Sequence, residues 1–176
     1  MTLPARLRWL WLTLVVVILD RATKAWFESQ TPEGWSRELI HHFVYLLHRT
    51  NPGIAFSFFA DSSSPWTRVI LIAGSIAMIL ALAWLLVRGS TGGPTTSAGL
   101  SLLLAGATGN VTDRLLHGAV TDFLEVWLGS YRWPAFNLAD AAITVGAVLI
   151  ILDVFFGASH AAATPTSSRK RPGTRN

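Results

Sequence analysis

The chain of 176 residues contains no cysteine. This absence excludes disulfide bonds, thiolate nucleophiles and metal sites built from cysteine, although it does not indicate a cellular compartment. The chain also lacks the Gly-x-Ser-x-Gly turn of α/β hydrolases and the His-Glu-x-x-His motif of zinc proteases. A hydrolase built from this sequence is therefore not expected to use a serine elbow or a zinc ion.

Charged residues are scarce as well. Asp, Glu, Lys and Arg make up 14% of the chain, whereas they make up about 25% of a typical soluble domain. Hydrophobic residues reach 51%, and the mean hydropathy is +0.44. The composition indicates a small membrane protein with little mass outside the bilayer.

Four stretches are long and apolar enough to cross a membrane, which takes roughly 20 residues in a helix. They are residues 9–27, 66–87, 98–116 and 137–156. The first is preceded by Arg6 and Arg8, as in a signal peptide, but it ends in DRATK and not in a small-residue cleavage site, so we expect it to stay uncleaved. The predicted fold is an all-α polytopic membrane protein with four transmembrane helices in one domain, residues 1–157.

Basic residues predict the orientation of these helices. Arg6, Arg8, Arg88 and the basic tail would share one side of a four-span protein, whereas acidic residues offset the cations in the two longer connections, 28–65 and 117–136. Because Lys and Arg favour the cytoplasmic side, both termini are predicted in the cytoplasm. The tail, residues 158–176, is predicted to be disordered. Its charge is interpreted as a topology signal, so no nucleic-acid partner is expected.

The polar residues of the spans gather near the predicted outer surface. A charge inside a bilayer costs from about 3 kcal/mol upward, so such residues are usually paired or functional. Asp122 lies in the short outer connection between the last two spans. The others, toward the outer ends of three spans, are Asp20, Lys24, Asn110, Asp113, Arg114, Asn137 and Asp140.

Two interpretations of this cluster stay open on the residues alone. In the first, the groups are structural: Asp20 and Lys24 are spaced to pair on one helix face, as are Asn110 and Arg114, and Asn137 with Asp140 has the spacing of a capping box. In the second, Asp122 and Asp140 come together, share a proton and activate a water molecule, as paired aspartates do in aspartic proteases.

Four blocks of the sequence resemble lipoprotein signal peptidase, also called signal peptidase II. They are LDRATK (19–24), TNPGIAFS (50–57), GNVTDRLLHGAVTDF (109–123) and WPAFNLADAAITVG (133–146). The resemblance covers everything but the tail. It implies an intramembrane aspartic protease of the bacterial inner membrane, with its active site near the outer face. Such an enzyme removes the signal peptide from diacylglyceryl-modified prolipoproteins, cutting before the lipidated cysteine.

The resemblance also implies which residues act. The catalytic aspartates would be Asp122 and Asp140, and a small β-cradle would form on the outer side, for which residues 43–59 supply a β-capable run with a turn at Asn-Pro-Gly. Two positions depart from the commonest pattern, since Arg21 stands where glutamine is frequent and Pro52 follows Asn51. The implied supporting or substrate-binding positions are Asp20, Lys24, Asn51, Gly53, Asn110, Asp113, Arg114 and Asn137.

The expected partners are diacylglyceryl-prolipoproteins, the lipid bilayer and the inhibitor globomycin, and a monomer is expected. No cofactor or metal is expected. The pair His41-His42 is more typical of a polar surface than of a metal site, because the ligand spacing of metal motifs is missing.

Two alternatives come from other functional classes. A small four-span transporter or channel would line its path with intramembrane charges, but transport sites lie near the midplane, and the inner halves of these spans are nearly all apolar. A structural helper for another membrane complex would explain paired charges. It would not explain two unpaired aspartates on either side of one short connection.

Overall fold

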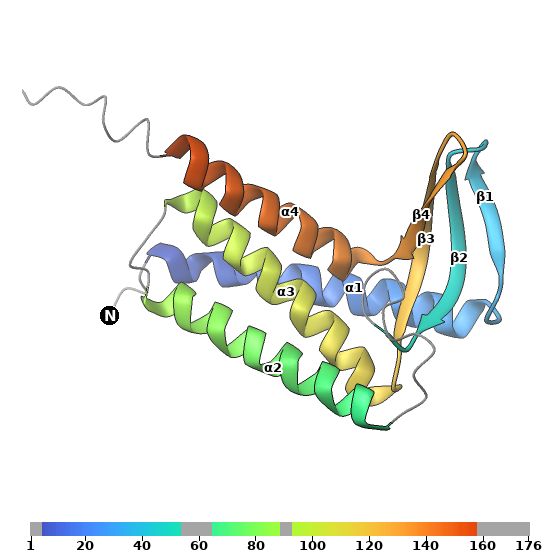
Figure 1. Ribbon diagram of the computed structural model, residues 1–176, viewed down its shortest axis with the longest axis horizontal. Coiled ribbons are helices and arrows are strands. Elements are labelled where there is room, and N and C mark those ends of the chain that lie inside the picture. Colours follow the sequence, from blue (N-terminus) through green and yellow to red (C-terminus); the bar gives the residue numbers. More distant parts are fainter. Residues whose placement is uncertain (1–4, 54–64, 89–92, 158–176) are drawn as a thin grey trace, which may run out of the picture.

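The computed structural model describes residues 5–53, 65–88 and 93–157. Four helices lie side by side, and a small sheet stands across one end of the bundle (Figure 1). A short 3₁₀ turn, η1 (Ala5–Trp9), precedes α1 (Leu10–Gln30), and it is followed along the chain by α2 (Pro65–Arg88) and α3 (Pro94–Leu116). The last helix, α4 (Leu138–Leu152), continues into one π-helical turn, η3 (Asp153–Gly157). The predicted tail lies outside the described residues.

The four helices agree closely with the four predicted apolar stretches. Two segments, Arg68–Arg88 and Leu138–Phe156, are long and apolar enough to cross a membrane by length and composition. In α1, charged residues such as Asp20 and Lys24 interrupt the apolar run, and α3 is rich in glycine, serine and threonine. The described helices therefore support the prediction of apolar spans most directly for α2 and α4.

Helix α3 lies at the centre of the bundle and packs against α1, α2 and α4. Its crossing with α4 is very close: a Cβ atom on Gly146 would lie 2.7 Å from the carbonyl oxygen of Gly99. Small residues allow such backbone contact between helices in membranes. On the other side of α3, a leucine cluster from α2 and α3 forms a small core, with Leu82 and Leu86 packed on Leu100 and Leu104.

The sheet is antiparallel with the strand order β1-β2-β3-β4. Strands β1 (Ser36–Ile40) and β2 (Val44–Asn51) come from the connection after α1, and β3 (Val120–Leu128) and β4 (Tyr131–Phe136) come from the connection between α3 and α4. The fold is therefore not all-α. The predicted cradle exists as a sheet, but half of its strands come from the second connection. The last six residues of the predicted run, 54–59, lie outside the described residues.

The placement of Asp122 in a loop was wrong. Asp122 lies in β3, where it is the pairing partner of Arg49 in β2. The connection between α3 and α4 is long enough for a hairpin, which turns at Gly129 with a φ angle of 64°. Strand β3 pairs with both β2 and β4 and is therefore an interior strand. At Asp122 itself the pairing is with β2, since the register with β4 begins at Leu124.

Both termini of the bundle lie at the end opposite the sheet. Figure 1 shows the start of α1 and the end of α4 together at one end, with the sheet at the other. The start of the first helix and the end of the last helix therefore lie on the same side of the molecule, as the predicted orientation requires.

Candidate active site

Asp122 is a buried carboxyl group on an interior strand. Its side chain belongs to a residue that is only 3% exposed. The Asn51 amide donates to Oδ2 over 3.2 Å, and the Asn137 amide donates to Oδ1 over 2.8 Å. Strand β2 and the start of α4 thus each supply one donor, and both oxygens of Asp122 are engaged.

Asp140 occupies the third position of α4, where it closes a capping box with Asn137. The Asn137 side-chain oxygen accepts from the Asp140 backbone N–H over 3.0 Å, and the Asn137 backbone N–H donates to Asp140 Oδ2 over 3.3 Å. The other carboxylate oxygen accepts from the Asn110 amide over 2.7 Å. Such a reciprocal cap fixes both residues at the helix start.

Asn137 joins the two aspartates. Its side chain bonds Asp122 and its backbone bonds Asp140, so the two carboxyl groups flank a single residue that is fully buried. Burial raises the pKa of Asp122, and the charge of Asp140 raises it further, to about 7, against the hydrogen bonds from Asn51 and Asn137. An ionised second carboxyl group beside a desolvated one has this effect. The capping box of the structural interpretation is present, and a catalytic role for the two aspartates stays a prediction.

Lys24 is the central cation of the network. It is 0% exposed, and its Nζ lies 2.7 Å from Asp20 Oδ2 and 2.7 Å from Asp113 Oδ2. The ammonium group also donates to the Asn110 side-chain oxygen over 3.2 Å. Because the Asn110 amide nitrogen reaches Asp140, Lys24 orients the donor that binds one of the two aspartates.

Asp20 and Arg114 attach other segments to this network. Asp20 Oδ1 accepts from the Ala139 backbone N–H over 2.9 Å, which ties α1 to the start of α4. Arg114 donates to the Gly53 carbonyl oxygen over 2.6 Å, and the Gly53 N–H donates to the Asn51 side chain over 3.0 Å. Arg114 therefore helps to place the segment that carries Asn51.

All of the predicted site residues lie in one connected network of hydrogen bonds and ion pairs, although two predicted pairings differ. The Arg114 guanidinium donates to the backbone carbonyl oxygen of Asn110 over 3.4 Å, and not to the Asn110 side chain. A pairing of Asp113 with its neighbour Arg114 is also expected from the sequence, but Asp113 pairs with Lys24 and Arg21 instead. The reason is geometric, since adjacent residues on a helix point in different directions.

Arg21 and Glu28 form a link between α1 and β3 that the sequence patterns did not predict. Arg21 donates to Asp113 Oδ1 over 2.9 Å and forms an ion pair with Glu28. The Glu28 carboxylate accepts from the Thr121 hydroxyl over 2.8 Å, and Thr121 directly precedes Asp122. The spacing of Arg21 and Glu28, two turns apart on one helix face, was the signal that could have revealed this link.

The aspartate pair does not have the surroundings of a metal centre within the described part of the chain. Two groups of three potential ligands have their atoms within 4.8 Å of one another there, and neither contains Asp122 or Asp140. The groups that contact the two carboxyl groups are amide N–H donors. Such donors bind carboxylates and do not bind metal ions. That the site works without a metal stays a prediction.

Comparison with solved structures defines the class of this fold. The chain superposes on a bacterial membrane enzyme solved by the in meso method at 2.3 Å resolution, with a TM-score of 0.78, 27% identity and 94% of each chain covered. A second bacterial membrane enzyme, solved at 1.9 Å, gives a TM-score of 0.76 at 30% identity, with 85% of this chain and 93% of that chain covered. The fold is that of bacterial membrane enzymes.

Comparison of sequences identifies the family. The family model of peptidase A8, signal peptidase (SPase) II, matches residues 12–156. A lipoprotein signal peptidase from Xylella fastidiosa (strain M12) is 39% identical over 93% of this chain and 98% of its own length. One from Psychromonas ingrahamii is 41% identical over 85% and 86% of the two chains. The chain belongs to the signal peptidase II family.

This membership makes the protein a peptidase. The resemblance seen in the four sequence blocks is confirmed over most of the chain. The alternative of a small transporter or channel gains no support from these comparisons, since the matching relatives and the family model are peptidases.

Proposed function

We propose that this enzyme removes the signal peptide from diacylglyceryl-modified prolipoproteins, cutting before the lipidated cysteine, with Asp122 and Asp140 as its catalytic pair. The observation that carries the proposal is Asn137, which hydrogen-bonds Asp122 and Asp140 at once. It does so in a chain whose relatives are lipoprotein signal peptidases.

The chemistry follows from the different surroundings of the two carboxyl groups. Asp140 lies in the first turn of α4 and accepts hydrogen bonds from Asn110 and the Asn137 backbone, whereas the pKa of Asp122 is raised to about 7. Asp140 then acts as the general base that takes a proton from the attacking water. Protonated Asp122 donates a hydrogen bond to the scissile carbonyl oxygen and polarises it.

The step balances without any co-reactant. The water oxygen bonds to the scissile carbonyl carbon, and its proton passes to Asp140. When the tetrahedral intermediate collapses, the carbon–nitrogen bond breaks and a proton returns to the leaving nitrogen. The products are a signal peptide with a free carboxylate and a lipidated cysteine with a free amino group.

The remaining network residues position this pair. Asn51, Asn110 and Asn137 hold the carboxyl oxygens through their amides, and they or Arg114 bind the peptide backbone of the substrate. The ion pairs of Lys24 with Asp20 and Asp113 brace α1 against α3. Groups held this way require little reorganisation when the substrate binds.

The substrate explains why the site would lie near the membrane surface. The acyl chains of a lipidated precursor stay in the bilayer, so the scissile bond lies near the membrane surface. We place the sheet end of the bundle outside the bacterial inner membrane, with all four helices spanning and both termini in the cytoplasm. The basic residues Arg6, Arg8 and Arg88 support this orientation, as does the position of both bundle termini opposite the sheet. We expect a monomer to suffice and globomycin to inhibit.

The test is turnover of a diacylglyceryl-modified precursor by purified Asp122→Asn and Asp140→Asn variants. Each loses an acid–base group, so its rate should fall by about 10²–10⁴-fold or more. Asp153→Asn is the matched control, because Asp153 lies at the opposite end of the bundle and accepts hydrogen bonds from Gly93 and Thr96. A folded Asp122→Asn or Asp140→Asn enzyme with a near-normal rate would refute the assignment.

A further inference from the structure

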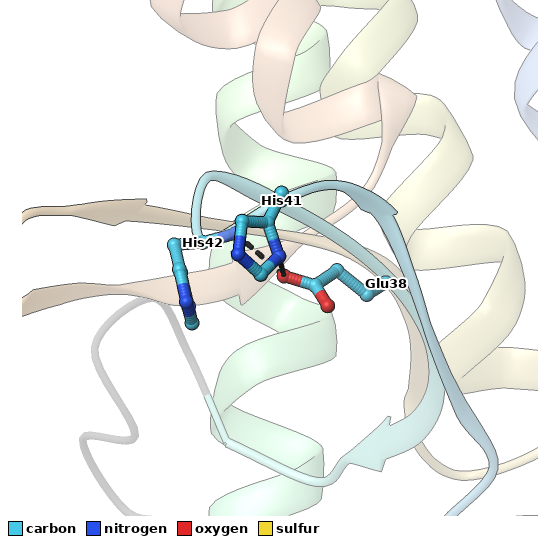
Figure 2. A group of neighbouring side chains, drawn as sticks. All are labelled: Glu38, His41 and His42. Carbon is cyan, nitrogen blue, oxygen red and sulfur yellow. Dashed lines mark hydrogen bonds and ion pairs between the residues drawn. The ribbon is translucent and has the colours of Figure 1, made fainter.

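The turn between β1 and β2 gathers two histidines and a glutamate away from the aspartate pair. Glu38 lies in β1, and His41 and His42 form the turn that follows (Figure 2). One potential ligand atom from each residue lies within 4.8 Å of the other two, and all three residues are exposed. None of them takes part in the network around Asp122 and Asp140.

The spacing of these atoms suits a small divalent ion. His41 Nδ1 lies 3.2 Å from Glu38 Oε1. Nitrogen and oxygen ligands at about 2.0–2.2 Å from zinc lie about 3.4 Å apart at a tetrahedral angle. The rings of His41 and His42 have their centroids 3.8 Å apart, so both imidazoles reach the same small volume beside the carboxylate.

The backbone of the turn holds this arrangement. The β1–β2 register shifts between Glu38 and Ile40, directly before the histidines, and such irregularities re-aim side chains. His42 has a φ of 54°, a left-handed conformation that glycine adopts without cost. A histidine in that position places a second imidazole next to His41, which glycine would not provide.

Glu38 is fixed and ionised. Its Oε1 accepts from the His42 backbone N–H and, over 3.1 Å, from the Tyr45 hydroxyl. The hydrogen bond from the His42 N–H is the largest effect on the pKa of Glu38, which is lowered; the Tyr45 hydroxyl and the nearby His41 lower it further. These hydrogen bonds hold the Glu38 carboxylate in place beside the two imidazoles.

The geometry points to a surface site for a borderline divalent transition-metal ion such as Zn²⁺, bound by the Glu38 carboxylate and the imidazoles of His41 and His42. Imidazole suits zinc, copper and nickel, whereas magnesium and calcium prefer oxygen ligands. The site clamps the β1–β2 turn. From the sequence alone, the two histidines are more typical of a polar surface pair than of a metal site, and Glu38, which precedes them by three and four residues, adds the carboxylate. This inference does not depend on the proposed catalytic roles.

The experiment is calorimetric titration of Zn²⁺ into the full-length protein, purified in detergent with a tag that contains no histidine and then freed of metal with a chelator. One ion per chain should bind, and Mg²⁺ and Ca²⁺ should not. His41→Ala, His42→Gly and Glu38→Gln should each weaken binding by at least about tenfold. His42→Gly keeps the left-handed turn, and in Glu38→Gln the amide oxygen still accepts the turn's hydrogen bonds, so both variants should fold.

His117→Ala is the matched control, because His117 is exposed and belongs to the other group of potential ligands, with Glu28 and Asp113. It should bind Zn²⁺ as the unmodified protein does. As a second measurement, Zn²⁺ should raise the thermal unfolding midpoint of the unmodified protein and leave that of His42→Gly unchanged. Binding that persists in all three turn variants, binding that is lost in His117→Ala, or no saturable binding at all would overturn the inference.

Discussion

At the scale of single residues, several charged side chains of this molecule are buried. Lys24 is fully buried between Asp20 and Asp113, and Arg21 adds a second cation to Asp113. A buried charge is tolerated when it is paired and hydrogen-bonded, and removing one partner leaves the other uncompensated. Two predictions follow from this burial, one about the raised pKa of Asp122 and one about the pairing of Lys24.

The first prediction concerns pH. The pKa of Asp122 is about 7, so as pH rises through that value Asp122 loses its proton and can no longer donate to the scissile carbonyl. We expect kcat/KM to fall at pH above about 7. In Asn51→Ala the carboxylate loses a donor that favours its charged form. The pKa should then rise and move the alkaline limb upward by about one pH unit.

The measurement is a pH profile of kcat/KM for both enzymes with the same lipidated precursor. Asn51→Ala is also expected to lower the rate, but a simple loss of substrate binding would not move the limb. An alkaline limb of the profile that stays in place, or moves to lower pH, would contradict the role of protonated Asp122 as the hydrogen-bond donor to the scissile carbonyl.

The second prediction concerns Lys24. Lys24→Met keeps much of the side-chain volume but leaves Asp20 and Asp113 without their shared ammonium group. We expect the free energy of unfolding to fall by about 3–5 kcal/mol, measured as a lower thermal midpoint in detergent. Arg37→Met removes an exposed cation from β1 and should change stability by less than about 0.5 kcal/mol. Equal effects of the two substitutions would contradict the structural role of Lys24.

At the scale of elements, three sets of contacts place the site. The capping box fixes the start of α4, and Asp20 binds the N–H of Ala139 in the same turn. The link from Arg21 through Glu28 to Thr121 holds β3 against α1. The start of α4, with Asp140, and strand β3, with Asp122, are thus both attached to α1. These attachments explain how the two elements come together.

The third prediction tests the close crossing of α3 and α4. In Gly146→Ala the new Cβ would lie 2.7 Å from the Gly99 carbonyl oxygen and 3.0 Å from the Leu103 backbone nitrogen. Backbone atoms cannot move aside as a side chain can, so the helices must separate, at a cost of about 1–3 kcal/mol. Gly74→Ala in α2 meets nothing within 4 Å and should be stabilising by about 0.5–1 kcal/mol, because alanine favours helix.

Thermal unfolding of the two glycine variants in the same detergent measures this difference. Because Asp140 lies on α4, Gly146→Ala should also lower the rate of peptide cleavage, while Gly74→Ala should not. A Gly146→Ala variant as stable as Gly74→Ala would show that the two helices do not pack this closely.

At the scale of the whole molecule, the helices present apolar side chains to their surroundings. Leu14 and Ile18 on α1 are 60% and 55% exposed, and Ile70 on α2 is 68% exposed. Extended exposure of this kind marks a surface that contacts protein or membrane. A bilayer around the bundle would cover it, and the sheet stands at one end of the bundle (Figure 1).

The fourth prediction tests orientation, and the absence of cysteine makes it simple. Ser36→Cys places a thiol on exposed β1, and Thr95→Cys places one at the exposed start of α3, at the other end of the bundle. In cells whose outer membrane has been opened, a membrane-impermeant maleimide should label Ser36→Cys. It should label Thr95→Cys only after the inner membrane is broken. The reverse pattern would invert the proposed topology.

The sequence determined the helices of this protein, and it singled out polar residues that the structure brings into one network. Apolar stretches of about 20 residues suffice to predict helices, and the predicted ranges agree with α1 to α4 within a few residues. The spacing of Asn137 and Asp140 also predicted the cap of α4. Such features depend on residues close together in the chain, so a local pattern is enough to reveal them.

Only the tertiary structure decided how the site is assembled. The strand position of Asp122 depends on pairing with Arg49, more than seventy residues away, and local sequence does not specify a distant partner. The same holds for Arg21, whose contact with Asp113 joins two helices, and for Asn137, whose amide meets Asp122 across the sheet end of the bundle. Burial in that assembly, and not the residue type alone, raises the pKa of Asp122.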